Sequence, residues 1–119
     1  MPFKTRYVFV VSMDVEPERD ALFNEVYDTE HVPELLSVPG VISVSRSKKR
    51  PASLAIGGEL KEVGDGEPGY IAYYEVEDPN ITSSDAWAKA SETGRWADEV
   101  RPYTHNRHHA MHEITVSAP

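Results

Sequence analysis

Two segments of this chain carry bulky apolar side chains at both odd and even positions. Residues 6–15 and 70–76 read RYVFVVSMDV and YIAYYEV, a pattern typical of β-strands that are apolar on both faces. Two helices cover only one face of a small antiparallel sheet, and the other face normally carries polar residues. Packing two such sheets face to face is the simplest way to bury an uncovered apolar face. The pattern therefore predicts a homodimer.

Residues 51–69 form a long connector with the sequence PASLAIGGELKEVGDGEPG, which contains five glycines and two prolines. Connectors of this length are uncommon in compact domains and tend to be lids, binding loops or mobile segments. An alternative to the homodimer is that this connector folds under the sheet and covers the second face in a monomer.

The first helix is expected to follow the strand at residues 6–15. Pro17 is typical of a first helical turn, and the helix is expected to run to about Thr29. Pro33 disfavours a helical conformation at Val32, so the sequence predicts a break or kink near His31 and a last turn over residues 33–36.

The rest of the chain completes a familiar order of elements. Strands are expected at residues 41–49, 70–76 and 103–116, and a second helix, capped by Thr82 or Ser83, carries residues 86–96 with an interruption near Gly94. The order β-α-β-β-α-β predicts an α+β, ferredoxin-like domain over residues 1–119, with two helices on one face of a four-stranded antiparallel sheet.

The composition narrows the possible partners. The net charge of −8 repels nucleic-acid phosphates and acidic lipid surfaces, and the basic cluster at residues 46–50 is interpreted as a solvated strand end. No apolar run approaches the length that crosses a bilayer. The chain has no cysteine, which excludes disulfides and thiolate chemistry and is consistent with a cytoplasmic protein. We therefore expect neither a nucleic-acid nor a membrane partner.

Residues 27–41, YDTEHVPELLSVPGV, contain the pattern Y-x-x-x-H-x-P-x-L-x-x-x-P-G-V. This stretch resembles the dimeric α/β-barrel proteins, and among them the EthD-like branch. The resemblance implies a homodimer with a pocket in each subunit between helices and sheet. The superfamily includes cofactor-free monooxygenases, polyketide cyclases, muconolactone-type isomerases, haem peroxidases and stress-responsive proteins, so the fold alone does not define a reaction.

His31 is the first candidate for chemistry. It follows Tyr27 by four residues, so both side chains can lie on one side of the first helix. A neutral imidazole accepts a proton near neutral pH, and a tyrosine hydroxyl hydrogen-bonds a substrate oxygen or holds the ring. These two are the predicted catalytic residues. The alternative interpretation is that His31 caps a broken helix and that Tyr27 is a packing residue.

Four histidines follow Pro102, namely His105, His108, His109 and His112. In a strand, His105 and His109 share one face and the other two share the opposite face, so neither pair is close enough to hold one metal ion. No metal site is therefore expected. His109 or His105 is predicted to line the pocket opposite His31, and the others are interpreted as surface or interface residues.

Aromatic residues supply the expected walls of the pocket. The predicted substrate-binding residues are Tyr73, Trp87, Tyr103 and His109. The leading hypothesis is a cofactor-independent lyase, isomerase, cyclase or oxygenase that acts on an apolar or aromatic compound with His31 as proton acceptor. The alternative is a non-catalytic stress-response protein or dimer that binds a hydrophobic ligand. A third hypothesis is haem binding through a histidine of the last strand.

Overall fold

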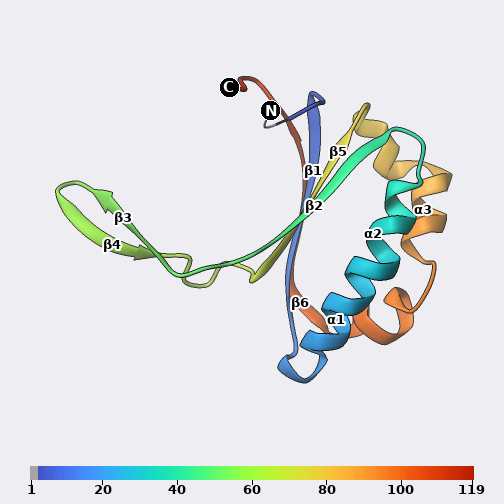
Figure 1. Cartoon of the computed structure of the whole chain (residues 1–119), viewed down its shortest axis with the longest axis horizontal. Helices are drawn as coiled ribbons and strands as arrows, with labels where there is room; N and C mark the ends of the chain where they lie inside the picture. Colours follow the sequence, from blue (N-terminus) through green and yellow to red (C-terminus); the bar gives the residue numbers. More distant parts are fainter. Residues whose placement is uncertain (1–2) are drawn as a thin grey trace.

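The computed structural model describes residues 3–119. Four strands, β1 (Tyr7–Val15), β2 (Val41–Lys48), β5 (Tyr70–Val76) and β6 (Thr104–Glu113), form an antiparallel sheet in the order β2-β5-β1-β6. All helices lie on one side of this sheet (Figure 1). The predicted ferredoxin-like α+β fold is therefore confirmed, with the two apolar strands β1 and β5 at the centre of the sheet.

The first helical segment has an irregular turn where the break or kink near His31 was predicted, but the chain does not leave the helix there. It consists of a 3-10 turn at Pro17–Arg19, α1 (Asp20–Val26), a π-helical turn at Tyr27–His31 and α2 (Val32–Leu36). The N–H of Val32 bonds to the carbonyl of Tyr27, five residues earlier. The wider π turn lets the chain pass Pro33, which has no N–H to donate, while Val32 stays helical.

The second helical segment begins one residue later than predicted. After a 3-10 turn at Pro79–Ser83, α3 (Asp85–Ser91) is capped by Ser84, whose Oγ accepts a hydrogen bond of 3.2 Å from the Trp87 N–H. The predicted interruption is present at Gly94, which has a φ of +78°. A π-helical turn at Trp96–Val100 and a 3-10 turn at Arg101–Tyr103 lead into β6.

The core fills the space between the helices and the sheet. Its sheet side comes from alternate residues of β1 and β5, which pair as Val11 with Ala72 and Phe9 with Tyr74. The helices contribute Phe23, Val26, Tyr27, Leu35, Trp96 and Val100, each at most 2% exposed. Burial of these apolar side chains is the main stabilising contribution to the fold.

The opposite face of the sheet has an apolar centre and polar margins. Val10 pairs with both Tyr73 on β5 and Ala110 on β6, and Ile71 lies beside them opposite Ser12. Serines of β2 (Ser43, Ser45, Ser47) and histidines of β6 (His108, His112) border this centre. Because β1 and β5 are apolar on both sides, the helices leave this central strip uncovered.

The connector contains a β-hairpin that the sequence reading did not anticipate. Strands β3 (Ala52–Ile56) and β4 (Glu59–Val63) pair antiparallel, and every residue in both is exposed. The hairpin extends away from the four-stranded sheet (Figure 1). The alternative in which residues 51–69 cover the second face of the sheet is therefore wrong for this structure, because the hairpin projects into solvent with both of its strands exposed.

Strand β6 contains a bulge that changes which histidines share a face. Asn106 has a φ of +51°, and the register with β1 shifts so that His108 pairs with Ser12 and His105 pairs with Asp14. The prediction that His105 and His109 share a face is therefore wrong, because one extra residue reverses the alternation. Only His109, opposite Val11, is on the helix-facing side beside the core.

Candidate functional site

A pocket of about 200 Å³ lies between the helices and the helix-facing side of the sheet. Five aromatic side chains line it: Phe9, Tyr27, Tyr74, Trp87 and Trp96. The polar side chains that line it are His31, Ser91, Arg101, Arg107 and His109. The pocket is therefore an apolar, aromatic space with a few polar groups directed into it, which is the usual composition of a small-molecule site.

The rings of the wall hold one another in fixed orientations. Trp87 packs edge to face on Phe9 at 5.7 Å between ring centroids and on Tyr74 at 5.3 Å. On the other side of the pocket, Tyr27 packs edge to face on Trp96 at 5.0 Å. Such contacts add to area burial and keep the wall rigid before any ligand arrives.

His31 is enclosed by two of these rings. Its imidazole stacks on Trp96 with 4.4 Å between centroids and an interplanar angle of 19°, and Tyr27 meets it edge-on at 5.0 Å. Only 5% of the residue is exposed. Its Nδ1 atom is buried and has no hydrogen-bond partner within residues 3–119. A buried polar atom without a partner is costly, so this nitrogen is a natural acceptor or donor for a ligand.

The surroundings keep His31 neutral. Burial is the main cause that lowers its pKa to about 4, and the positive charge of Arg101 acts in the same direction. The carboxylate of Glu92 acts the other way but does not compensate. At neutral pH the ring is therefore an uncharged imidazole, the form that can accept a proton.

Tyr27 and Tyr74 form a buried pair of hydroxyls. The two oxygens are 2.8 Å apart, and one hydroxyl donates to the other. Burial raises the pKa of both, so both are neutral phenols. The mutual bond uses one of the two hydroxyl protons. The second proton is available to a ligand oxygen in the pocket, so the pair can act as a hydrogen-bond donor but not as a base.

One ion pair fixes the distance between the two helical segments that carry His31 and Trp96. The Glu30 carboxylate accepts hydrogen bonds from the backbone N–H of Arg95 at 2.9 Å and from its Nε at 2.7 Å. Gly94 has a φ of +78°, a conformation that side chains rarely adopt, and a Cβ there would lie 2.7 Å from the Glu30 Oε1, so glycine is favoured at this position. His31 follows Glu30 in the sequence and Trp96 follows Arg95, so this ion pair joins the two segments next to the stacked pair of the pocket.

Four of the six predicted site residues lie together in this pocket: Tyr27, His31, Trp87 and His109. The structure does not bring Tyr73 or Tyr103 to it. Tyr73 pairs with Val10 on the uncovered face of the sheet, since neighbouring residues of a strand point to opposite faces and Tyr74 points to the helices. Tyr103 lies at the end of the helical region, where the Arg19 guanidinium stacks 3.8 Å from its ring centroid.

Sequence reasoning missed Arg101, Arg107 and Ser91, all of which line the pocket. Arg107 lies two residues before His109 on β6, so alternation in a strand places both on one face. That spacing was the available signal. Ser91 is the last residue of α3, four residues after Trp87, so helical periodicity was the available signal for it. Arg101 lies in a 3-10 turn that no periodicity predicts.

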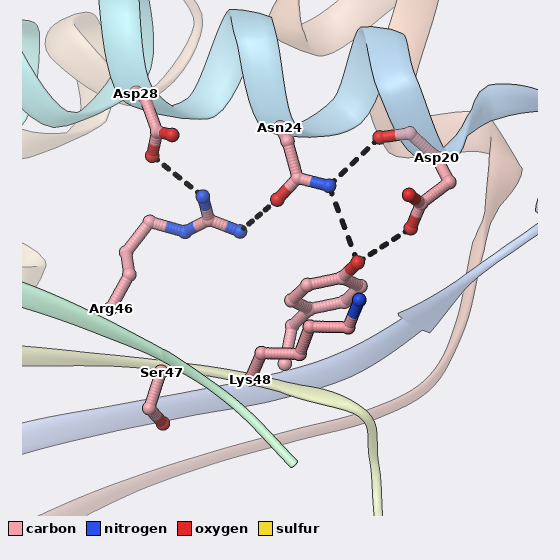
Figure 2. Close-up of a pocket in the computed structure, with 7 residues that line it drawn as sticks. Asp20, Asn24, Asp28, Arg46, Ser47 and Lys48 are labelled. Carbon is pink, nitrogen blue, oxygen red and sulfur yellow. Dashed lines mark hydrogen bonds and ion pairs between the residues drawn. The ribbon is translucent and has the colours of Figure 1, made fainter. Parts of the chain in front are cut away.

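A second hollow, of about 510 Å³, lies between α1 and the edge strand β2, and Figure 2 shows its polar groups bonded to one another. Arg46 bonds Asp28 at 2.6 Å and Asn24 at 3.0 Å, and the Tyr70 hydroxyl donates to Asp20 at 2.6 Å. A network whose members are already satisfied has little need of a ligand. The enclosed pocket around His31 is therefore the stronger candidate site.

The sheet order and the helices on one face define the class of fold: an α+β, ferredoxin-like domain. Among solved structures, an ethyl tert-butyl ether D (EthD) family protein from Bacillus halodurans C-125 matches with a TM-score of 0.56 and 12% identity, over 90% of this chain and 97% of that one. The fold implied by the resemblance at residues 27–41 is therefore confirmed.

The haem degrader MhuD from Mycobacterium tuberculosis, with two haems bound in its active site, matches with a TM-score of 0.56 and 13% identity, over 95% of this chain and 99% of that one. A mutant of MhuD with two manganese protoporphyrin IX molecules per active site matches with a TM-score of 0.59 and 12% identity, over 95% and 98% of the two chains. No protein-family model and no curated protein matches the sequence.

Two further features bear on the class of site. Within residues 3–119, no group of three or more histidine, cysteine, aspartate or glutamate side chains is arranged to hold a metal ion. No helix in this part of the chain is long and apolar enough to span a membrane.

Proposed function

We propose that this chain is a homodimeric, cofactor-independent enzyme that acts on an apolar or aromatic organic compound in the pocket around His31. The reaction class is a lyase, isomerase, cyclase or oxygenase step in which His31 accepts a proton from the substrate. The observation that carries the proposal is a neutral imidazole, buried among aromatic rings, whose Nδ1 has no partner within the described residues.

The roles of the other residues follow from their positions around His31. The Tyr27–Tyr74 pair has one hydroxyl proton to offer, and it would stabilise negative charge that develops on a substrate oxygen when a proton is removed. Trp87 and His109 line the same pocket and would hold the ring of the substrate. A proton acceptor and an oxygen-binding donor on one aromatic pocket are the groups that proton abstraction next to a carbonyl requires.

The dimer would form through the uncovered face of the sheet. Its central strip, which contains Val10, Ile71 and Tyr73, has no cover from any helix. A second copy presents the same strip and can bury it symmetrically. The EthD family protein and MhuD share this fold over almost the whole chain, which supports the arrangement.

The alternative is a dimer that binds a hydrophobic ligand without turning it over. One observation favours it: an imidazole with a pKa of about 4 is a weak base at neutral pH, and general bases work best when their pKa lies near the operating pH. Catalysis therefore requires that the bound ligand raise the pKa of His31. A binding protein has no such requirement.

Porphyrin binding of the kind found in MhuD does not fit this pocket. Sites for drug-sized ligands measure roughly 300–1,000 Å³, whereas the cavity here measures about 200 Å³. The ring of His31 is stacked on Trp96, and that of His109 is stacked on Phe9 at 6.2 Å. A compound of one or two rings suits this space better.

Replacement of His31 by asparagine separates the enzyme from the binding protein. We expect the variant to lose activity by a factor of roughly 10²–10⁴, the usual contribution of a general base, in a turnover assay on candidate cyclic ketones and lactones. Circular dichroism and sedimentation should show an unchanged fold and subunit number. Undiminished turnover in a folded variant would contradict the role of His31, and Asn24→Ala in the second hollow is the matched control.

A further inference from the structure

Two guanidinium groups face the aromatic pocket, and they differ in their partners. Arg101 is paired with Glu92, with 3.0 Å between Nη1 and Oε1, and also donates to the carbonyl of Ser91 at 3.1 Å. Arg107 has no carboxylate within ion-pair distance in residues 3–119. Its polar contact is with Nε2 of His109, at 3.5 Å.

Among the arginines that form no ion pair in residues 3–119, Arg107 is the one that lines the aromatic pocket. Acidic residues outnumber basic ones by 20 to 12, so carboxylates are abundant. Three arginines around the helices pair with carboxylates, Arg46 with Asp28, Arg95 with Glu25 and Glu30, and Arg101 with Glu92. Arg19 instead donates to the carbonyl of Glu99 and stacks on Tyr103. Arg107, by contrast, lines the pocket beside His109 with its donors largely free. Arg107 is exposed and lines the pocket, so its guanidinium is open to an anionic partner from outside the chain.

We propose that the ligand of this pocket is a small aromatic or alicyclic carboxylate, and that Arg107 binds its carboxylate group. This inference rests on the proposed function, because it names the class of compound that the same site binds. The planar fork of a guanidinium matches the two oxygens of a carboxylate. The rings of Phe9, Trp87 and Trp96 would then enclose the apolar part of the ligand.

The charges around the pocket agree with an anionic ligand. Burial, followed by the nearby charge of Arg101, lowers the pKa of Arg107, so the empty pocket holds two cations that repel each other. Arg101 and Arg107 both lower the pKa of His31 as well. A bound carboxylate offsets both effects and makes His31 a stronger proton acceptor at neutral pH. The carboxylate that Arg107 binds would therefore also raise the basicity of His31.

The test compares 2-naphthoate with its neutral analogue 2-naphthamide by isothermal titration calorimetry. Trp87 and Trp96 are the two tryptophans of the chain and both line the pocket, so quenching of their emission locates the binding. Hydrogen bonds to charged groups contribute about 1.5–3 kcal/mol, so we expect the acid to bind roughly 10- to 100-fold more tightly than the amide. In Arg107→Gln this preference should fall to about twofold or less.

Two further variants complete the experiment. Arg50→Gln changes the net charge equally but lies at the exposed start of the hairpin, and it should keep the preference for the acid. Arg107→Lys keeps the charge and loses the planar fork, so an intermediate preference is expected, and it replaces Arg107→Gln if circular dichroism shows that variant unfolded. Equal binding of acid and amide by the original protein would overturn the carboxylate inference alone. Absence of binding and quenching by both compounds would overturn the proposed aromatic ligand as well.

Discussion

At the scale of single residues, the environment of His31 decides what this pocket can do. A histidine at this position in the sequence is compatible with a helix cap, a packing residue or a base. The structure places its ring flat against Trp96 and leaves Nδ1 without a partner in the described chain. At pH 7 the ring is mostly neutral in the unfolded chain too, where its pKa is 6.5, whereas protonation in this enclosed place is unfavourable.

This environment predicts how stability depends on pH. The pKa of His31 is about 4 in the folded protein and 6.5 in the unfolded chain, so the unfolded state takes up the proton first as pH falls. The contribution is fully present above pH 6.5 and is lost progressively toward pH 4. Integration of the linkage relation gives a loss of about 2 kcal/mol in the free energy of unfolding between pH 7.5 and pH 5.

Urea unfolding at several pH values checks this prediction when His31→Phe is measured in parallel. Other groups titrate in both proteins, so their effects cancel in the difference between the two curves. The original protein should lose the additional 2 kcal/mol or so, and the variant should not. Parallel curves for the two proteins would show that His31 is not held in its neutral form.

At the scale of elements, the π-helical turns and the hairpin each depart from the simple element order. The turn at Tyr27–His31 contains both predicted catalytic residues, and the helix continues from it through Pro33 without a break. The hairpin β3–β4 is an insertion between β2 and β5, and its base is closed by a hydrogen bond of 2.7 Å from the Lys49 N–H to the Gly69 carbonyl. Because the hairpin pairs only with itself in the sheet topology, the sheet does not depend on it.

Removal of the hairpin should therefore leave the domain folded. In the variant, Asn-Gly replaces residues 50–68, which joins Lys49 to Gly69 by a two-residue turn that suits antiparallel strands. We expect the free energy of unfolding to change by less than about 1 kcal/mol, because a shorter loop costs less entropy and the lost contacts are exposed. Urea unfolding measures this. A loss of several kcal/mol would mean that the hairpin covers part of the core.

At the scale of the whole molecule, the two faces of the sheet differ in what covers them. The helices bury one face and form the pocket there, while the strip around Val10 and Tyr73 on the other face has no cover within the described chain. The pocket is built entirely from one chain, so ligand binding does not require the proposed partner. Subunit number and ligand binding can thus be tested separately.

Val10→Lys tests the proposed dimer. A lysine in the centre of the strip would place two like charges opposite each other across the two-fold interface, at a cost that exceeds what a small interface can compensate. In sedimentation at micromolar concentration, we expect the original protein at twice its mass of 13.3 kDa and the variant at that mass. Ala88→Lys, on the exposed side of α3, is the control and should remain dimeric. A monomeric original protein would contradict the dimer.

The sequence by itself determined the order of the four sheet strands and two helical segments, the two strands that are apolar on both faces, and the placement of Tyr27 and His31 four residues apart on one helical segment. These are local properties, because alternation and proline chemistry act over a few residues. Only the tertiary structure decided which aromatic and basic side chains meet. The register of β5 places Tyr74 on the helix-facing side and Tyr73 on the opposite side. The bulge at Asn106 places His105 on the opposite face of the sheet from His109. Long-range strand pairing sets that register, and it brings Arg101 and Arg107 to one pocket.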